Sequence, residues 1–159
     1  MKFLNAFAIL IFSALVTDSY SQDTAALAAK IKILRNETIS RKDLIKTEKL
    51  IWLVDEKNHK ELFTLWKFTD SITGKLVSAT KWHTTISKKE KRDIIETIYY
   101  VENNPEYFTI FDELKFSNGE RLVRYGDYQL EDGAIITKAE NNLLLNLTKI
   151  LETIQQLNF

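Results

Sequence analysis

The chain has 159 residues, of which 45% are hydrophobic and 28% charged, and it contains no cysteine. This composition is typical of one globular domain, and it excludes a disordered tail, a disulfide scaffold and a multidomain enzyme. The formal net charge is zero. The sequence has no glycine-rich nucleotide motif and no clustered metal ligands, so we expect neither a cofactor nor a metal.

The first 21 residues have the pattern of a secretory signal peptide. Lys2 gives a positive start, residues 3–16 are almost wholly apolar, and Ser19 and Ser21 place small residues before a cut at Gln22. A membrane anchor is disfavoured, because about 14 apolar residues fall short of the roughly 20 that span a bilayer. We therefore expect residues 22–159 to form one secreted or periplasmic domain without a transmembrane segment.

The neutral total conceals a charge asymmetry. Residues 22–95 contain 16 basic and 10 acidic residues, whereas residues 96–140 contain 4 basic and 10 acidic. The densest basic run, residues 88–92, is interrupted by Glu90 and offers no aromatic side chain on which a base could stack. The asymmetry could orient the protein near an anionic surface, or the two halves could pack together and leave this run as a solvated face. We favour the solvated face and expect no nucleic-acid partner.

The N-terminal part of the mature chain predicts helices. Leu27, Ile31 and Leu34 follow helical spacing after Asp23. Ser40 with Asp43 is typical of a second helix start. The apolar run Leu50 to Val54 is equally consistent with a buried helix end or a central strand, and the capping pattern favours the helix.

The middle of the chain predicts hairpins. Leu62 to Phe68 and Leu76 to Trp82 are rich in aromatic, β-branched and threonine residues, and a turn-forming segment separates them. Ser87 with Glu90 is a capping box, which favours a turn of helix leading into a strand from Ile94 to Val101.

The last third predicts strands followed by a helix. Tyr107 to Phe116 and Arg121 to Tyr128 flank Asn118-Gly119, a strong hairpin signal, and a short strand follows near residues 133–137. Thr137 with Glu140 is a further capping box before a C-terminal helix. The apolar face of that helix should pack on the sheet, and it consists of Leu143, Leu147, Ile150, Leu151 and Ile154.

The elements together predict an α+β fold. Its centre is an antiparallel β-meander, either an open curved sheet or a closed barrel, and N-terminal helices and a C-terminal helix pack on it.

A two-residue turn at Asn118-Gly119 would fix the register of its hairpin. Leu114 would face Val123, Asp112 would face Tyr125, and Glu113 would face Arg124. Asp112 then shares an otherwise apolar face with Phe108, Ile110, Leu114 and Phe116. Such a carboxyl could line a ligand cavity or act as an acid of raised pKa, or it could form a structural pair with the tyrosine.

The string from Leu114 to Ile136, with Asn118-Gly119 and then Gly126-x-Tyr128-x-Leu130, resembles the last strands of secreted lipocalin-like proteins of bacteria. The resemblance covers about 25 residues, and no Gly-x-Trp motif stands near the mature N-terminus. It implies a lipocalin-like barrel with an apolar cavity for a small hydrophobic ligand, and no catalysis.

Few residues are suited to catalysis. His59 and His83 are the only side chains that titrate near neutral pH without a perturbed pKa, and no nucleophile motif accompanies them. His83, beside Trp82, is the better candidate for a cleft. Trp66 and Trp82 could line a ligand pocket, as could Trp52, although large aromatics at strand spacing more often form a core.

Two functional classes therefore remain open. The first is a non-catalytic extracytoplasmic module that binds a small hydrophobic ligand or a protein partner, with Asp112, Tyr125, Trp66, Trp82 and His83 as candidate site residues. The second is a small secreted enzyme that uses His83 or Asp112. Asn36 and Asn146 lie in glycosylation sequons, which matter only if the source glycosylates exported proteins.

Overall fold

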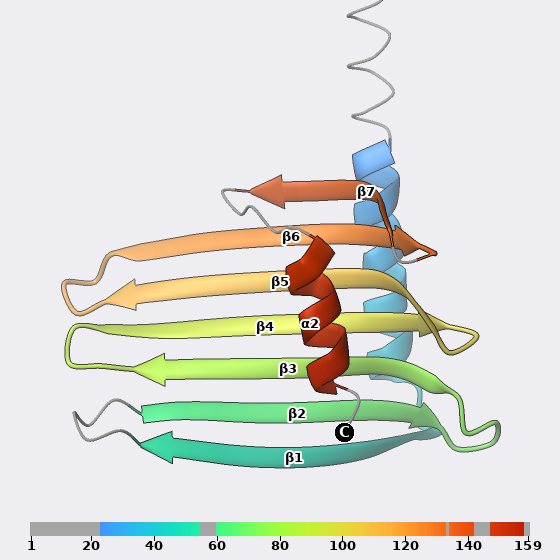
Figure 1. The fold of residues 1–159 in the computed structure, drawn as a ribbon, viewed down its shortest axis with the longest axis horizontal. Helices are drawn as coiled ribbons and strands as arrows, with labels where there is room; N and C mark the ends of the chain where they lie inside the picture. The colour runs from blue at the N-terminus through green and yellow to red at the C-terminus, as the bar shows by residue number, and fades with distance from the viewer. Residues whose placement is uncertain (1–22, 55–59, 133, 142–146, 158–159) are drawn as a thin grey trace, which may run out of the picture.

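A computed structural model describes residues 23–54, 60–132, 134–141 and 147–157. A seven-stranded antiparallel sheet occupies its centre, and each strand pairs with its sequence neighbours (Figure 1). β1 and β7 lie at opposite edges, so the sheet is an open meander and is not closed into a barrel. The elements are β1 (Leu44–Val54), β2 (Lys60–Asp70), β3 (Leu76–Ile86), β4 (Glu90–Val101), β5 (Asn104–Phe116), β6 (Arg121–Glu131), β7 (Ala134–Asn141) and α2 (Leu147–Leu157).

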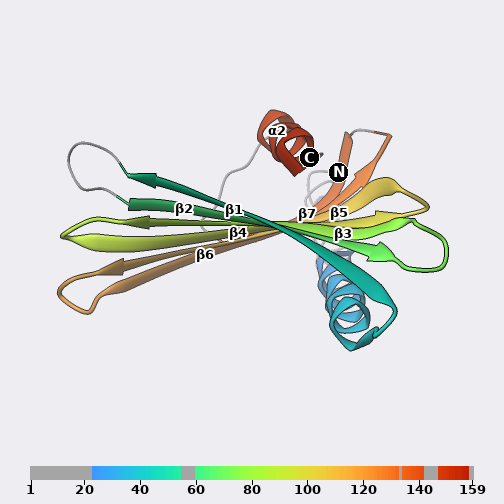
Figure 2. The same cartoon turned by 90° about the horizontal axis from the view of Figure 1, so that it is seen from below.

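One helix covers each face of the sheet. The N-terminal helix, residues 23–40, lies on one face, and α2 lies on the other (Figure 2). We call these the N-helix face and the α2 face. Because side chains alternate along a strand, each strand contributes to both faces, and the two faces have separate hydrophobic clusters.

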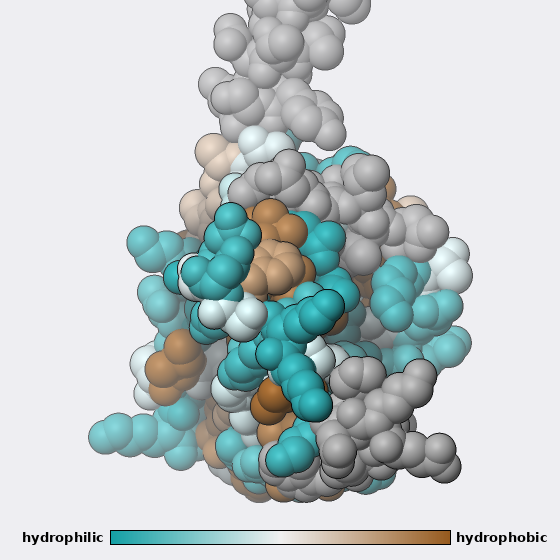
Figure 3. Space-filling model, turned by 90° about the vertical axis from the view of Figure 1, so that its left-hand side faces the viewer, coloured by the Kyte–Doolittle hydropathy of each residue, from teal (hydrophilic) through white to brown (hydrophobic). Residues whose placement is uncertain are grey.

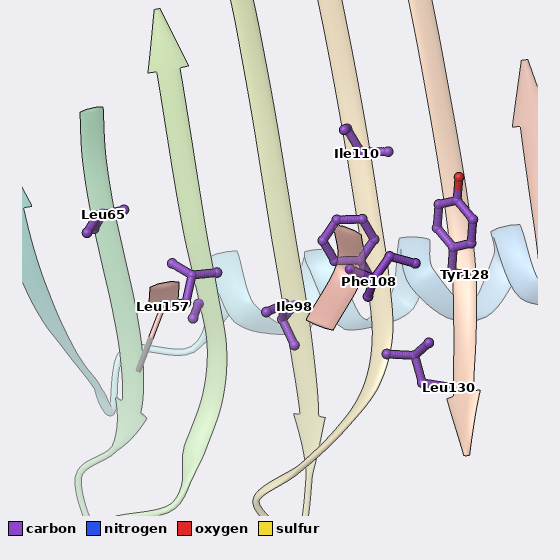
Figure 4. Close-up of a cluster of buried hydrophobic side chains, with 9 residues drawn as sticks. Leu65, Ile98, Phe108, Ile110, Tyr128, Leu130 and Leu157 are labelled. Atoms are coloured by element: carbon purple, nitrogen blue, oxygen red, sulfur yellow. The ribbon is translucent and has the colours of Figure 1, made fainter. Parts of the chain in front are cut away.

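The larger cluster lies on the α2 face. Ile150 and Leu157 of α2 are fully buried against aromatic and aliphatic side chains of the sheet, among them Ile98, Phe108 and Tyr128 (Figure 4). The predicted helix stripe is confirmed for Leu147, Ile150 and Ile154, whereas Leu151 is exposed and Leu143 lies outside the described residues.

A polar contact also joins α2 to the sheet. The buried Thr153 hydroxyl donates to Glu96 Oε1 at 3.0 Å, and Lys81 Nζ lies 3.3 Å from Glu96 Oε2. Because the buried carboxylate is both hydrogen-bonded and paired with a cation, its desolvation is compensated.

The smaller cluster forms beneath the N-terminal helix. Leu27 and Ile31 are buried against Tyr99 and Tyr107, and Leu34 packs beside them. The helical spacing of these three residues therefore predicted the correct buried face. The strands extend beyond both helices toward the β3–β4 and β5–β6 turns (Figure 2).

Two predicted helix starts are wrong. Ser40 belongs to the end of the N-terminal helix, and the chain continues into β1 where a second helix was expected. Ser87 forms the tight β3–β4 turn, in which its Oγ accepts hydrogen bonds from the amides of Lys89 and Glu90. A serine hydroxyl satisfies nearby amides in a turn as well as at a helix start, so the sequence pattern does not distinguish them.

The third capping box is also wrong. Thr137 and Glu140 belong to β7, and α2 begins at Leu147. The predicted short strand near residues 133–137 therefore extends further than expected. Pairing with β6, which runs from Tyr125–Asn141 to Glu131–Ala134, outweighs the local capping signal.

The β5–β6 register is shifted by one residue from the predicted one. Leu114 pairs with Leu122, Asp112 with Arg124 and Glu113 with Val123. The loop contains three residues instead of two, because the Phe116 amide bonds to the Glu120 carbonyl and Gly119 closes a turn on Phe116. Gly119 has a φ of +90°, as expected for the glycine that follows a type I turn in a three-residue hairpin.

Candidate functional site

The register shift separates two of the predicted site residues. Asp112 points to the α2 face, and Tyr125 lies on the N-helix face, where it pairs with Phe111. The prediction that Asp112 faces Tyr125 is therefore wrong, as is the expected pairing of Glu113 with Arg124. Glu113 instead forms ion pairs with Lys115 and Arg121.

Asp112 lies between two arginines. Arg92 of β4 donates two hydrogen bonds of 2.9 Å to its two carboxylate oxygens, and Arg124 of β6 pairs with Oδ2. Burial favours the protonated carboxyl, but the hydrogen bonds and charges of both arginines outweigh it, and the pKa of Asp112 lies below its ordinary value. This carboxylate therefore stays ionised, contrary to the hypothesis of an acid with a raised pKa.

His83 shares the α2 face with Asp112 but is separated from it. Ile94 of β4 pairs with both residues, so their strands lie two spacings apart, roughly 10 Å. The imidazole stacks on Phe63 with ring centroids 4.1 Å apart, and Nε2 lies 3.6 Å from a Glu61 oxygen. Burial lowers the pKa of His83, which favours the neutral ring at pH 7.

Trp66 and Trp82 lie together on the N-helix face. Their rings meet edge to face with centroids 6.0 Å apart. Trp82 Nε1 donates to Asp93 at 3.2 Å, and the Thr84 hydroxyl donates to the same carboxylate oxygen at 2.6 Å. The side chains of Trp52 and His59 lie outside the described part of the chain.

A pocket of about 460 Å³ lies between the end of the N-terminal helix and the sheet. Trp66 is one wall of it, and the structure thus supports this residue as a lining residue of a cavity. Trp82, His83, Asp112 and Tyr125 do not line it. The lining residues are Arg35, Thr38, Ile39, Arg41, Leu44, Trp66, Phe68, Ser78, Thr80, Thr97 and Tyr99.

The pocket combines an apolar wall with a polar floor. Thr80 and Thr97 hydroxyls lie 3.0 Å apart on neighbouring strands. Burial raises the pKa of Tyr99, and a hydrogen bond from Arg35 opposes this rise. The phenol therefore remains neutral at pH 7 and can donate or accept a hydrogen bond.

The second arginine of the pocket is held in place by two carboxylates. Arg41 pairs with Asp43 and Asp70, and these two contacts raise its pKa. The Asp70 carboxylate also accepts the amides of Ile72 and Thr73, so it closes the β2–β3 turn. These contacts hold the chain in place where the N-terminal helix ends and β1 begins, and they position Arg41 in the pocket lining.

A second cavity is less suited to an apolar ligand. It measures about 360 Å³ and lies between α2 and the ends of β5 and β6. Three carboxylates line it, those of Glu106, Glu131 and Asp132. A carboxylate must keep its hydration or find a partner, so an apolar molecule in this cavity would be disfavoured.

No pattern in the sequence indicated the residues on the helix side of the first pocket. Thr38, Ile39 and Arg41 lie near a helix end, and only the docking of that helix on the sheet brings them opposite Trp66 and Phe68. Within the described ranges, no cluster of three or more residues could hold a metal ion. Nor does any helix there have the length and apolar character needed to cross a bilayer.

The architecture defines the chain as an α+β protein with an open antiparallel meander between two helices. Comparison with protein families, curated proteins and solved structures found no match to this chain.

Proposed function

We propose that this chain is a non-catalytic, extracytoplasmic binding module that holds a small hydrophobic ligand in the pocket between the N-terminal helix and the sheet. The pocket volume of about 460 Å³ carries this proposal, since it falls in the usual range for small-molecule sites. Aromatic and aliphatic side chains would contact the body of the ligand. The threonine hydroxyls and Tyr99 would orient its polar end.

The alternative of a small secreted enzyme has less support. His83 and Asp112 both lie on the α2 face, but they do not contact each other, because Ile94 of β4 lies between them. Asp112 is held ionised by two arginines, and His83 is stacked on Phe63. Neither side chain lines either of the two cavities described above, where a substrate could meet it.

The lipocalin-like resemblance and this proposal imply the same class of ligand, a small hydrophobic molecule. They differ in where the ligand binds. In an open sheet there is no barrel lumen, so the ligand would lie under the helix. Export rests on the signal-peptide pattern of residues 1–21, which lie outside the described residues.

Ligand binding can be tested with two probes of equal chain length, decanoate and decanol. We expect saturable binding of at least one probe by calorimetry, because the cavity can remove an alkyl chain from water. Substituting Thr38→Trp should weaken this binding by about tenfold or more, since a bulky indole would enter the pocket from the helix. Preference for decanoate would assign a role to Arg35.

The matched control is Glu37→Trp, one residue earlier on the same helix. Glu37 is exposed and does not line the pocket, so this variant should bind like the unaltered protein. The absence of saturable binding, or an equal loss in both variants, would contradict the proposal. Circular dichroism of both variants would exclude unfolding as the cause of a loss.

A further inference from the structure

The sheet side of the ligand pocket divides into an apolar part and a hydroxyl-bearing part. Two rows of paired residues cross β2, β3 and β4 there, and they are Phe68–Ser78–Tyr99 and Trp66–Thr80–Thr97. Both apolar aromatic residues belong to β2, whereas the four residues with hydroxyl groups belong to β3 and β4. Since β2 and β4 lie two strand spacings apart, roughly 10 Å, the polarity changes within the length of one small molecule.

The two arginines of the pocket differ in how their charges are paired. Arg41 is held by Asp43 and Asp70, so its charge is already offset. In the described part of the chain Arg35 forms no ion pair, and it hydrogen-bonds to the neutral phenol of Tyr99 on β4. Arg35 therefore lies at the hydroxyl-bearing side of the pocket, and no contacting carboxylate offsets its charge.

Asp127 of β6 is the carboxyl that Arg35 influences from a distance. Burial raises the pKa of Asp127, and the attraction of Arg35 opposes this rise only in part. A carboxylate in direct contact with guanidinium groups shows the opposite shift, as Asp112 does between Arg92 and Arg124. A guanidinium carries five N–H donors, so Arg35 can bind Tyr99 and an acidic group of a ligand at the same time.

The basic run at residues 88–92 is another place where an acidic group could bind. It lies at the turn end of the sheet, where apolar side chains reach the surface between charged ones (Figure 3). Lys91 and Arg92 are paired there with Asp93 and Asp112. None of these residues lines either of the two cavities, so the run could attract an acidic group without enclosing the chain attached to it.

We propose that the ligand is a single-chain amphiphile whose acidic head group, a carboxylate or a phosphate, binds Arg35 and Tyr99 while its alkyl chain contacts Trp66 and Phe68. This inference rests on the proposed function, since it requires that the pocket holds a ligand. The planar guanidinium of Arg35 can donate two parallel hydrogen bonds to either kind of acid. The threonine and serine hydroxyls of β3 and β4 can donate to the same head group.

The size of the pocket agrees with one alkyl chain. A ten-carbon chain needs roughly 300 Å³, if each carbon takes about the 30 Å³ that a water molecule takes in the liquid. The pocket of about 460 Å³ holds one such chain, and a second chain of the same length would exceed it.

Calorimetry with decanoate, decyl phosphate and decanol separates the head group from the chain. We expect the unaltered protein to bind at least one of the two acids about tenfold or more tightly than decanol, because charge-assisted hydrogen bonds add to the same burial of the chain. The acid that binds more tightly identifies the head group. Arg35→Gln should abolish the preference and leave the decanol Kd within about twofold of its original value.

Lys32→Gln is the matched control, because Lys32 is exposed about one turn earlier on the same helix and does not line the pocket. It removes the same charge and should retain the preference for the acid. If decanol binds as tightly as both acids, or if Arg35→Gln weakens the binding of all three probes equally, the head-group assignment is overturned and the ligand pocket stands. If no probe binds, the proposed function itself is contradicted, and this inference is overturned with it.

Discussion

At the scale of single residues, Asp112 illustrates how the sheet uses a buried carboxyl. It is 2% exposed, yet two arginines from the flanking strands satisfy both of its oxygens. The sequence placed Asp112 correctly in an apolar row of β5. It did not identify Arg92 and Arg124 as the partners, because they depend on the register of two strand pairs.

Asp112→Asn should therefore destabilise the protein in a pH-dependent way. The pKa of Asp112 is lower in the folded protein than in the unfolded chain, where an aspartate titrates near about 4. Its contribution to stability is thus complete above that pH and is lost as the pH falls through the folded pKa. We expect a loss of about 2 kcal/mol at pH 7 by urea unfolding, decreasing toward pH 3.

Glu131→Gln is the control for this experiment, since Glu131 is exposed at the end of β6. It should change the free energy of unfolding by less than about 0.5 kcal/mol. A constant difference between Asp112→Asn and the unaltered protein from pH 3 to pH 7 would contradict an ionised Asp112.

At the scale of elements, the apolar stripes of the helices were better predictors than the capping patterns. The apolar stripes of the N-terminal helix and of α2 predicted their buried faces, because each stripe depends only on helical periodicity. The three capping patterns at Ser40, Ser87 and Thr137 failed. In each case pairing between strands provided more hydrogen bonds and burial than a local helix start.

The docking of α2 can be measured with Ile150→Ala. Ile150 is fully buried between α2 and the sheet, so removing its side chain should cost about 2 to 5 kcal/mol of unfolding free energy. Leu151→Ala, one residue later and 39% exposed, should cost about 1 kcal/mol or less. Equal small losses in both variants would mean that α2 does not pack on the sheet.

At the scale of the whole molecule, the sheet separates two hydrophobic clusters. The α2 face and the N-helix face share the backbone of the strands but bury different side chains, as the alternation along β4 and β5 requires. The pocket lies on one face and the Asp112 ion pairs on the other. A ligand under the N-terminal helix would therefore not contact Asp112 directly.

The two clusters should contribute independently to stability. Leu27→Ala in one cluster and Ile150→Ala in the other should add within about 0.5 kcal/mol in the double variant, because the sheet separates the two sites. Ile150→Ala combined with Leu157→Ala should depart from additivity, since both residues belong to one cluster. A strong coupling between Leu27 and Ile150 in urea unfolding would show that the faces are not independent.

The sequence by itself determined the properties that depend on local pattern: an antiparallel meander, with one amphipathic helix before it and another after it. These follow from periods of two and of 3.6 residues, which can be recognised within one segment. The tertiary structure decided the strand character of residues 44–54, the three-residue β5–β6 loop, the open sheet and the pocket. Each of these depends on which distant segments pair. The free energy of that pairing cannot be evaluated from a short stretch of sequence.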